Sequence, residues 1–182
     1  SEIVEDYNVT GFDSETAGQK TITVEFGGKT TTFTVNVKAI ELESIEIATP
    51  ADKTEYFTGE EADYTGLTIK ANYNNGTSEI VEDYNVTGFD SETAGQKTIT
   101  VEYEGKTTTF TVTIKAIELV SVEIETTPDK TEYYTNEVFD ATGLTLKATY
   151  NNGTTAIITE GYALGNVDMT TAGQKTVTVT YE

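Results

Sequence analysis

The feature that most constrains this sequence is an internal repeat. Residues 1–25, SEIVEDYNVTGFDSETAGQKTITVE, recur unchanged as residues 78–102, which is 77 positions later. The Asn75-Gly76 pair recurs after the same interval as Asn152-Gly153. Between Gly153 and Tyr162 the last copy has gained one residue, because the later motif Ala-Gly-Gln-Lys recurs after 78 positions. A chain that repeats a unit of this length is expected to build one small domain per copy, each in contact mainly with its neighbours.

The repeat divides the chain into three parts. We expect residues 40–116 to form a complete repeat, residues 1–39 to be the C-terminal half of a preceding one, and residues 117–182 to be a repeat that lacks its final strand. The copies meet at a recurring joint, residues 38–42 (KAIEL) and residues 115–119 (KAIEL). The joint has no run of Gly, Ser or Pro, which predicts a short and fairly stiff connection. Because both ends of the sequence fall inside a repeat, we expect the polypeptide to continue in both directions.

Apolar and polar residues alternate along most segments, which is the period of a half-buried β-strand. Leu67, Ile69, Ala71 and Tyr73, for example, are separated by polar residues. Turn residues such as those of 74–77 (NNGT) stand between these segments, and no segment has helical periodicity over a helical length. About seven short strands in a repeat of about 77 residues describe an all-β fold of tandem immunoglobulin-like β-sandwiches, here without disulfides.

Composition excludes several classes of function. The sequence contains no Cys, His, Trp or Arg, so it lacks thiol nucleophiles, the commonest general base and the usual readers of phosphate and guanine. Its net charge of −20 comes from 31 acidic residues against 11 lysines, a balance that repels nucleic acid. No apolar run approaches the roughly 20 residues that a membrane-spanning helix requires. We therefore expect no nucleic-acid partner and no membrane insertion.

The order of motifs resembles the group 3 bacterial Ig-like domains over all three copies. The matching segments of the complete repeat are residues 42–47 (LESIEI), 53–60 (KTEYFTGE), 63–67 (DYTGL), 71–77 (ANYNNGT), 88–90 (GFD), 93–101 (TAGQKTITV) and 105–107 (GKT) with the strand that follows. The resemblance implies a secreted or wall-attached bacterial protein in which tandem copies space a functional head from the envelope, and it carries no catalytic residues. Copy three departs from the pattern at Asn136, in place of Gly59, and across residues 162–170, where the loops are open to a different shape.

Paired carboxylates are the candidate acid–base groups of this sequence. Glu82-Asp83 and Asp90 with Glu92 are the nearest candidates for a glycosidase-like pair. Copy three replaces Asp83 by Gly161 and Glu92 by Thr170, so the favoured interpretation is solvated surface charge. Calcium is a better-motivated alternative, since its ligands are oxygens, but no Asp-x-Asp-x-Asp-Gly loop is present and loop capping is the preferred interpretation. The recurring aspartates in question are Asp13, Asp63, Asp90, Asp140 and Asp168.

Two further patterns are open to a functional or a structural interpretation. Asn8, Asn75, Asn85 and Asn152 each begin an Asn-x-Thr triplet, the acceptor pattern for N-glycosylation, although two of them also lie in predicted turns. Tyr56-Phe57 and Tyr133-Tyr134 place two aromatic residues side by side, so one ring of each pair must point outward from a strand. That ring either binds a sugar or protein or, as we prefer, covers the joint between domains.

Taken together, the sequence predicts a non-enzymatic stalk, spacer or fibre shaft of a microbial extracellular or cell-surface protein. No catalytic, cofactor-binding or metal-ligating residue is assigned, and no cofactor is expected. The expected partners are neighbouring repeats, arranged end to end as an extended rod. The same geometry is open to a filament of like chains, which either continue head to tail or trade the strand missing from 117–182. Two alternatives stay open: an adhesin that binds host glycan or protein, and accessory domains of a secreted wall or polysaccharide hydrolase.

Overall fold

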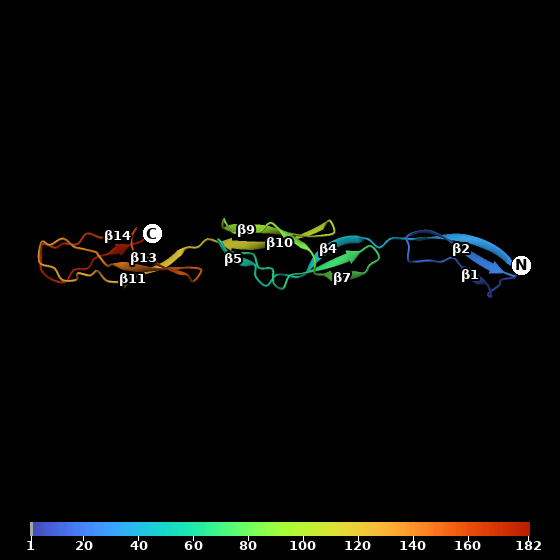
Figure 1. Ribbon diagram of the computed structural model, residues 1–182, viewed down its shortest axis with the longest axis horizontal. Coiled ribbons are helices and arrows are strands. Elements are labelled where there is room, and N and C mark those ends of the chain that lie inside the picture. The colour runs from blue at the N-terminus through green and yellow to red at the C-terminus, as the bar shows by residue number, and fades with distance from the viewer. Residues whose placement is uncertain (1) are drawn as a thin grey trace. The chain divides into compact units, whose positions relative to one another are not determined.

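The computed structural model describes residues 2–182, and every regular element in that range is a β-strand. None of these residues belongs to a helix that could cross a membrane. Figure 1 shows the strands with the labels used below. The predicted all-β fold is confirmed.

The chain forms two compact units that interleave in the middle repeat. The first unit holds Ser1–Asp52, Tyr64–Gly88 and Ile99–Phe110, and the second holds Lys53–Asp63, Phe89–Thr98 and Thr111–Glu182. The division of the chain into domains at 39/40 and 116/117 stays a prediction from the repeat.

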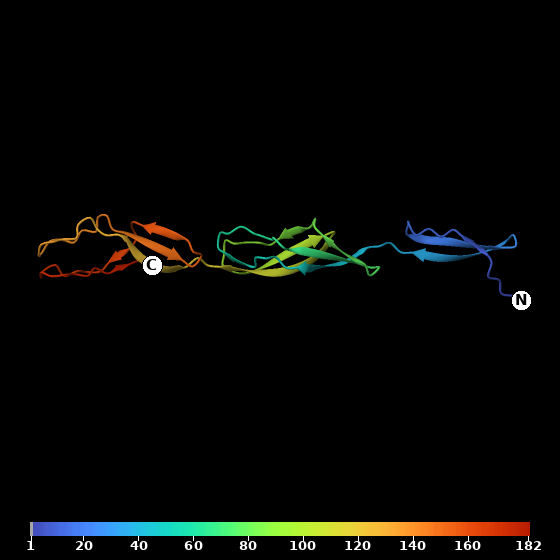
Figure 2. The same ribbon diagram turned by 90° about the horizontal axis from the view of Figure 1, so that it is seen from below.

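Residues of the first repeat form one antiparallel sheet in the order β1-β2-β3. Its strands are β1 (Asn8–Thr10), β2 (Gly18–Phe26) and β3 (Lys29–Val37). The β2–β3 hairpin, blue in Figure 1 and seen from below in Figure 2, is paired along its whole length. Ile22 is buried, but Phe26 and Phe33 are about half exposed, at 51% and 52%. The apolar side of β3 is therefore only partly covered.

The middle repeat contains two sheets, in the orders β4-β6-β7 and β5-β10-β9-β8. Their strands are β4 (Leu42–Thr49), β5 (Glu55–Phe57), β6 (Thr68–Tyr73), β7 (Ser78–Val81), β8 (Asn85–Thr87), β9 (Gly95–Tyr103) and β10 (Lys106–Lys115). All pairings are antiparallel except that of β10 with β5, which is parallel. Two facing sheets of this kind are the architecture that the alternating pattern predicts.

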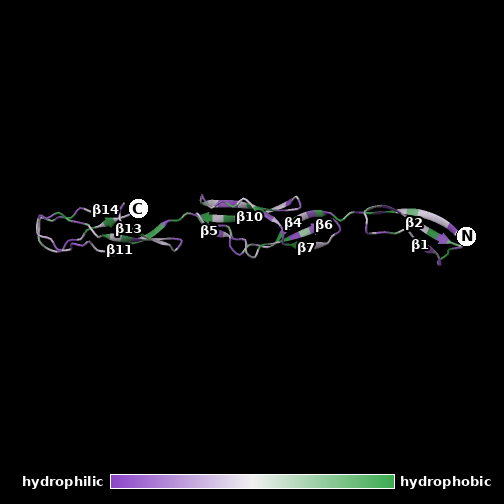
Figure 3. Ribbon diagram, viewed as in Figure 1, coloured by the Kyte–Doolittle hydropathy of each residue, from purple (hydrophilic) through white to green (hydrophobic). Residues whose placement is uncertain are grey.

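The core of the first unit lies between strands of both sheets. Ile45, Ile69, Ala71 and Val81 of the β4-β6-β7 sheet form one buried cluster with Val101 of β9. Figure 3 shows the resulting alternation of hydrophilic and hydrophobic residues along the strands. Burial of one face only is what a two-residue period requires, because successive side chains of a strand point to opposite faces.

In the second unit, Tyr56 of β5 anchors a loop as well as a strand. Its side chain is only 1% exposed, and its ring meets Phe89 edge-on, with 4.9 Å between centroids. The Tyr56 hydroxyl donates to the carbonyl oxygen of Asp63 at 2.7 Å and accepts from the Asp63 N–H at 3.3 Å. The hydroxyl also lies 3.2 Å from the carbonyl oxygen of Lys53. One side chain thus ties together both ends of the segment 53–63.

The third repeat forms the sheet β11-β12-β13 and a separate pair, β14-β15. These strands are β11 (Leu119–Thr126), β12 (Thr145–Tyr150), β13 (Thr155–Ile158), β14 (Ala163–Leu164) and β15 (Val179–Thr180). The β11–β12 pair has two register shifts, and these match the two shifts of the β4–β6 pair. Leu144, Leu146 and Ala148 stay buried, as their counterparts in the middle repeat do.

Two turns show how the copies keep one shape with different residues. Glu104 has a φ of 46° before Gly105 at 79°, the left-handed conformation that the tight β9–β10 hairpin requires. Asn136 has a φ of 68° and replaces Gly59, whose φ is 83°. Asparagine tolerates this region better than most residues. The Asn136 loop therefore keeps the conformation of the Gly59 loop.

We expect Tyr56→Phe to destabilise the middle repeat by about 1–3 kcal/mol, because it leaves part-buried backbone groups without their hydroxyl partner. Urea unfolding would measure the change. Tyr103→Phe is the matched control, since no hydrogen bond of its hydroxyl is described within residues 2–182. Equal effects of the two substitutions would show that the Tyr56 hydroxyl does not hold the segment.

Candidate functional site

The candidate carboxylates Asp83 and Asp90 lie in different surroundings. Asp83 lines an open depression with Glu102 and Glu104, while Asp90 is engaged in an ion pair with Lys97 at 2.7 Å. Among the residues described, no group of three or more acidic side chains is placed to hold a metal ion. Asp90 therefore already has a cationic partner of its own.

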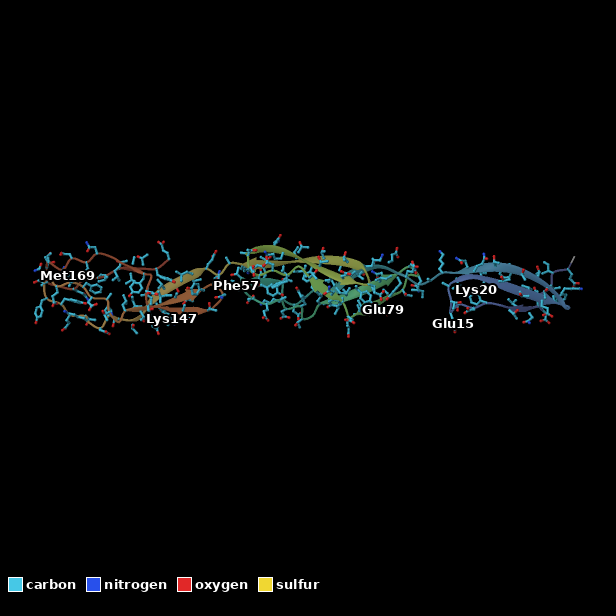
Figure 4. The ribbon with its side chains drawn as sticks, turned by 45° about the horizontal axis from the view of Figure 1, so that its top comes forward. Glu15, Lys20, Phe57, Glu79, Lys147 and Met169 are labelled. Atoms are coloured by element: carbon cyan, nitrogen blue, oxygen red, sulfur yellow. The ribbon has the colours of Figure 1, made fainter. Side chains whose placement is uncertain are left out.

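A clamp of aspartate, threonine and lysine recurs in all three copies at the loop that precedes β2, β9 and their counterpart. In the middle copy, Lys97 Nζ donates to Asp90 Oδ2 at 2.7 Å and to Thr93 Oγ1 at 2.6 Å. The Glu92 N–H donates to Asp90 Oδ1 at 2.8 Å. Its counterparts are Asp13, Thr16 and Lys20 in the first copy, where Lys20 and Glu15 are labelled in Figure 4, and Asp168, Thr171 and Lys175 in the third.

These contacts favour the charged form of each aspartate. Hydrogen bonds from Lys97 and from the Glu92 N–H hold the pKa of Asp90 below its ordinary value. The pKa of Asp13 is lowered by Lys20 in the same way. At Asp168 the largest effect on the pKa is the hydrogen bond from Thr170, since the ion pair with Lys175 is longer, at 3.8 Å. The recurring aspartates act here as loop caps.

Two other calcium candidates are also engaged in their own loops. The backbone of Asp63 bonds to the Tyr56 hydroxyl. The Asp140 side chain accepts from the hydroxyl and N–H of Thr142, at 2.6 and 2.9 Å, and these bonds lower the pKa of Asp140. The Asp140 carboxylate thus caps its loop, while Asp63 is bonded to its loop through the backbone.

The Asn-x-Thr triplets divide into two kinds. Asn75 Oδ1 accepts from the N–H of Thr77 at 3.0 Å and from its hydroxyl at 2.7 Å, and Asn152 makes the same two bonds with Thr154. Asn8 and Asn85 instead begin β1 and β8. The turn asparagines thus have a structural role within the hairpin.

The aromatic pairs differ between copies in exposure. Tyr56 is buried and Phe57, labelled in Figure 4, is half-buried, whereas Tyr134 is 84% exposed. A lysine lies 4.6 Å from the ring centroid of each inner tyrosine, Lys53 over Tyr56 and Lys130 over Tyr133. The coverage of a domain joint by the outer ring stays a prediction.

An asparagine that the sequence did not single out holds the joint. Asn74, the first residue after β6, donates from Nδ2 to the carbonyl oxygen of Ala39 at 3.1 Å. Its Oδ1 accepts from the Glu41 N–H at 3.2 Å, and its own N–H donates to the Glu41 carbonyl oxygen at 3.0 Å. The joint residues before β4 are therefore bonded to the β6–β7 turn.

The same contacts recur at the second joint. Asn151 donates to the carbonyl oxygen of Ala116 at 3.0 Å and accepts from the Glu118 N–H at 3.0 Å, while its N–H donates to the Glu118 carbonyl oxygen at 3.0 Å. We call these two sets of contacts the joint clasps. Their sequence signal is a second asparagine before each Asn-Gly pair, which the turn itself does not need.

The third repeat has an open groove of ≈ 630 Å³ whose lining mixes apolar and polar residues. Its lining includes Ile124, Tyr133, Phe139, Leu144, Val177 and Val179. Val177 and Val179 are half-buried, whereas their counterparts Ile99 and Val101 in the middle repeat are fully buried. The core of this repeat is thus incomplete on one side.

Removal of one clamp should weaken the middle repeat at neutral pH. Because the folded pKa of Asp90 lies below its ordinary value of 3.8, its stabilisation is present above pH 3.8 and is lost as the pH falls through the lower folded value. Asp90→Asn is expected to lower the melting temperature modestly at pH 7, with a difference from the unchanged chain that shrinks in acid. Thermal melts followed by circular dichroism across this pH range would measure it.

Asp83→Asn is the control for that experiment, because it removes the same charge outside any ion pair of the described residues. A difference between Asp90→Asn and the unchanged chain that persists undiminished in acid would contradict the role of the ionised carboxylate.

Comparison with known proteins gives relatives that are much longer than this chain. Pectate lyase L of Thermoclostridium stercorarium is 42% identical over 125 residues, which cover 68% of this chain and 10% of the relative. An exo-beta-1,6-galactobiohydrolase of Bifidobacterium longum subsp. longum is 42% identical over 103 residues, which cover 53% of this chain and 7% of the relative. The chain therefore spans about a tenth or less of the length of these curated relatives.

Among solved structures, domains 4–9 of the surface layer protein SbsC are 21% identical, with a TM-score of 0.37, over 91% of this chain and 31% of that one. The profile of the bacterial Ig-like domain, group 3, matches residues 4–37, 49–114 and 126–182, so that all three copies are recognised. The resemblance carried by the turn and core motifs is confirmed: this chain belongs to the group 3 bacterial Ig-like domains.

Proposed function

We propose that this chain is a non-catalytic spacer within a larger extracellular bacterial protein. The observation that carries the proposal is the pair of joint clasps. A spacer keeps its length only if the joints between its repeats have a restricted conformation. Only residues 38–41 lie between β3 and β4, and only residues 116–118 lie between β10 and β11. In each joint, two residues of this short connection are bonded to the following repeat through one asparagine.

The clasps restrict the conformations of the joint more than its short length alone would. The asparagine side chain binds one carbonyl oxygen and one N–H two residues apart, so the connection cannot rotate freely at either residue without a bond being broken. Hydrogen bonds of this exposed kind each contribute about 0.5–1.5 kcal/mol. The three hydrogen bonds of a clasp together favour one orientation of the connecting residues where they enter the following repeat.

The charge of the chain supports the same role. Each described ion pair joins two residues of the same repeat, for example Lys70 with Glu46 and, in the third repeat, Lys147 (labelled in Figure 4) with Glu123. The excess of 31 acidic residues over 11 lysines is left at the surface. Like charge keeps such modules soluble and apart from one another.

The curated relatives favour one setting for the spacer, an accessory region of a secreted enzyme that acts on polysaccharide. One relative is a pectate lyase and the other an exo-beta-1,6-galactobiohydrolase, and this chain corresponds to a small part of each. Polysaccharides are too large to enter a cell, so an enzyme of this class works outside it. A stalk at the cell surface is the other setting. Both settings require a module that keeps two parts of a protein apart and has no catalytic activity.

The clasp should set the distribution of distances across the first joint. The chain has no cysteine, so the substitutions Thr32→Cys and Thr109→Cys allow two spin labels to be attached at exposed positions on either side of the joint. We expect a narrow distance distribution by electron–electron double resonance. Asn74→Ala, which removes two of the three clasp bonds, should widen it towards that of a free linker.

Asn75→Ala is the matched control, because Asn75 is the adjacent turn residue and bonds only to Thr77. A broad distribution in the chain with Asn74 intact, or equal broadening by the two substitutions, would rule out a joint held by the clasp.

A spacer should not bind the polymers on which its neighbours act. We expect the chain to pass without retardation through affinity gels that contain pectate or β-1,6-linked galactan. Retardation of the chain, abolished by Tyr134→Ala at the most exposed aromatic ring, would instead support the adhesin alternative. Retardation unaffected by Tyr134→Ala would also contradict the spacer and would place the binding surface elsewhere.

A further inference from the structure

We infer that Asn75 and Asn152 are sites of spontaneous deamidation, and that this modification at Asn75 loosens the joint clasp held by Asn74. The chemistry of the modification is independent of the proposed function. The loosening of the joint rests on the proposed function, because it requires that the clasp restricts the joint.

These two asparagines are the only ones in the sequence that a glycine follows, whereas a valine follows Asn8 and Asn85. Deamidation begins when the backbone nitrogen of the next residue attacks the side-chain amide carbon, and a side chain on that next residue hinders the attack. Glycine has none. Beyond the neighbouring residues, no heavy atom of the described chain lies within 4 Å of the Cβ position of Gly76. The approach to the reacting nitrogen is therefore open.

The turn holds the Asn75 amide in a form suited to this attack. Its Oδ1 accepts from the Thr77 N–H at 3.0 Å and from the Thr77 hydroxyl at 2.7 Å. The bond to the N–H closes a ring that contains both the Asn75 amide carbon and the Gly76 nitrogen, so the side chain is folded back towards the atom that reacts. Both donors also stabilise the negative charge that forms on Oδ1 when the nitrogen adds. Asn152 makes the same two bonds with Thr154.

The leaving group is Nδ2 of Asn75, for which no hydrogen bond is described within residues 2–182, and the residue is exposed. The neighbouring Asn74 differs, since its Nδ2 donates to the carbonyl oxygen of Ala39. The Gly76 N–H must lose its proton, and it bonds to the Tyr73 carbonyl oxygen at 2.9 Å. The reaction thus requires the opening of one bond in an exposed turn, where local opening is least costly.

The reaction balances without an oxidant or a reductant. The Gly76 nitrogen forms a bond to Cγ of Asn75, the bond from Cγ to Nδ2 breaks, and the proton of the Gly76 N–H leaves with Nδ2 as ammonia. Water then opens the resulting succinimide ring at either of its two carbonyl groups. One product is aspartate. The other is isoaspartate, in which the backbone runs through the side-chain carbonyl and is one methylene longer.

Isoaspartate changes the turn that positions the clasp. The Tyr73 N–H donates to the carbonyl oxygen of Thr77 at 2.9 Å, and the Gly76 N–H donates to that of Tyr73. Both bonds span position 75, so an additional backbone atom there alters the separation of their donors and acceptors. Asn74 lies in the same turn, and its side chain reaches the joint from it. Isoaspartate should therefore release the clasp, whereas aspartate keeps the length of the backbone.

The chemistry is tested by incubation of the folded chain at mildly alkaline pH, followed by digestion in acid and mass spectrometry of the peptides. We expect the mass increase of deamidation at Asn75 and Asn152 well before any at Asn74 or Asn85, with isoaspartate among the products. Thr77→Val removes one donor to Oδ1 and should slow the reaction at Asn75 about 2- to 10-fold, the rate equivalent of one exposed hydrogen bond. Asn152 in the same chain is the internal control.

The effect on the joint is tested with the spin-label pair Thr32→Cys and Thr109→Cys. The distance distribution should be narrow in the fresh chain and should widen after incubation. Asn75→Ala removes the reactive amide, so the same incubation should leave its distribution unchanged. Asn75→Asp in a fresh chain supplies the charge of deamidation without the additional methylene and should also keep the distribution narrow.

Four results would overturn the inference in whole or in part. Modification of Asn75 no faster than that of Asn85 would overturn the site. An unchanged or higher rate in Thr77→Val would overturn the activation of the amide by the turn. Equal widening of the incubated Asn75→Ala chain would overturn the loosening. A distribution that is already broad in the fresh chain would overturn the proposed function and the loosening together, while the mass spectra alone decide the modification.

Discussion

The structure depends above all on the pairing of β10 with β5, two strands whose ends lie 60 positions apart in the sequence. A β-sandwich buries its apolar face only when its last strand closes the second sheet. In the middle repeat that strand is present, and Tyr56, Val112 and Ile114 are almost fully buried. In the third repeat, the same kinds of side chain stay half exposed around a groove. Burial here is a consequence of one long-range pairing.

Short-range polar contacts stabilise loops, and they are found in every copy. The Asp–Thr–Lys clamp is present in all three copies. The lysine–glutamate ion pair beside the inner tyrosine is present in two copies, as Lys53 with Glu60 and Lys130 with Glu137. Exposed ion pairs contribute little each to stability. Their effect is local: they cap loops whose backbone N–H groups have no strand partner. A surface rich in carboxylates thus serves as a source of loop caps.

The strands could be predicted because alternation is a local property, and the turn at Asn75-Gly76 because its residues fit only one kind of hairpin. The fold and the family followed from these patterns. The role of Asn74 could not be predicted, since its partners Ala39 and Glu41 lie about 33–35 positions away and approach it only in the folded repeat. The same holds for Asp90, which is a calcium candidate by composition and becomes a cap because Lys97 reaches it across the start of β9. Asn136 keeps the shape of a glycine loop, which composition alone would not indicate.

The distribution of these contacts explains why copies can be added without redesign. Clamps lie inside one repeat, and each clasp joins a repeat only to the residues that immediately precede it. No contact of either kind depends on a unique residue elsewhere in the chain, so a duplicated repeat brings with it all that its own loops and joint require. In a repeat protein, stability is then close to a sum over units and their neighbours. Selection on length can therefore act through the number of copies, while the sequence of each copy stays nearly unchanged, as residues 1–25 and 78–102 show.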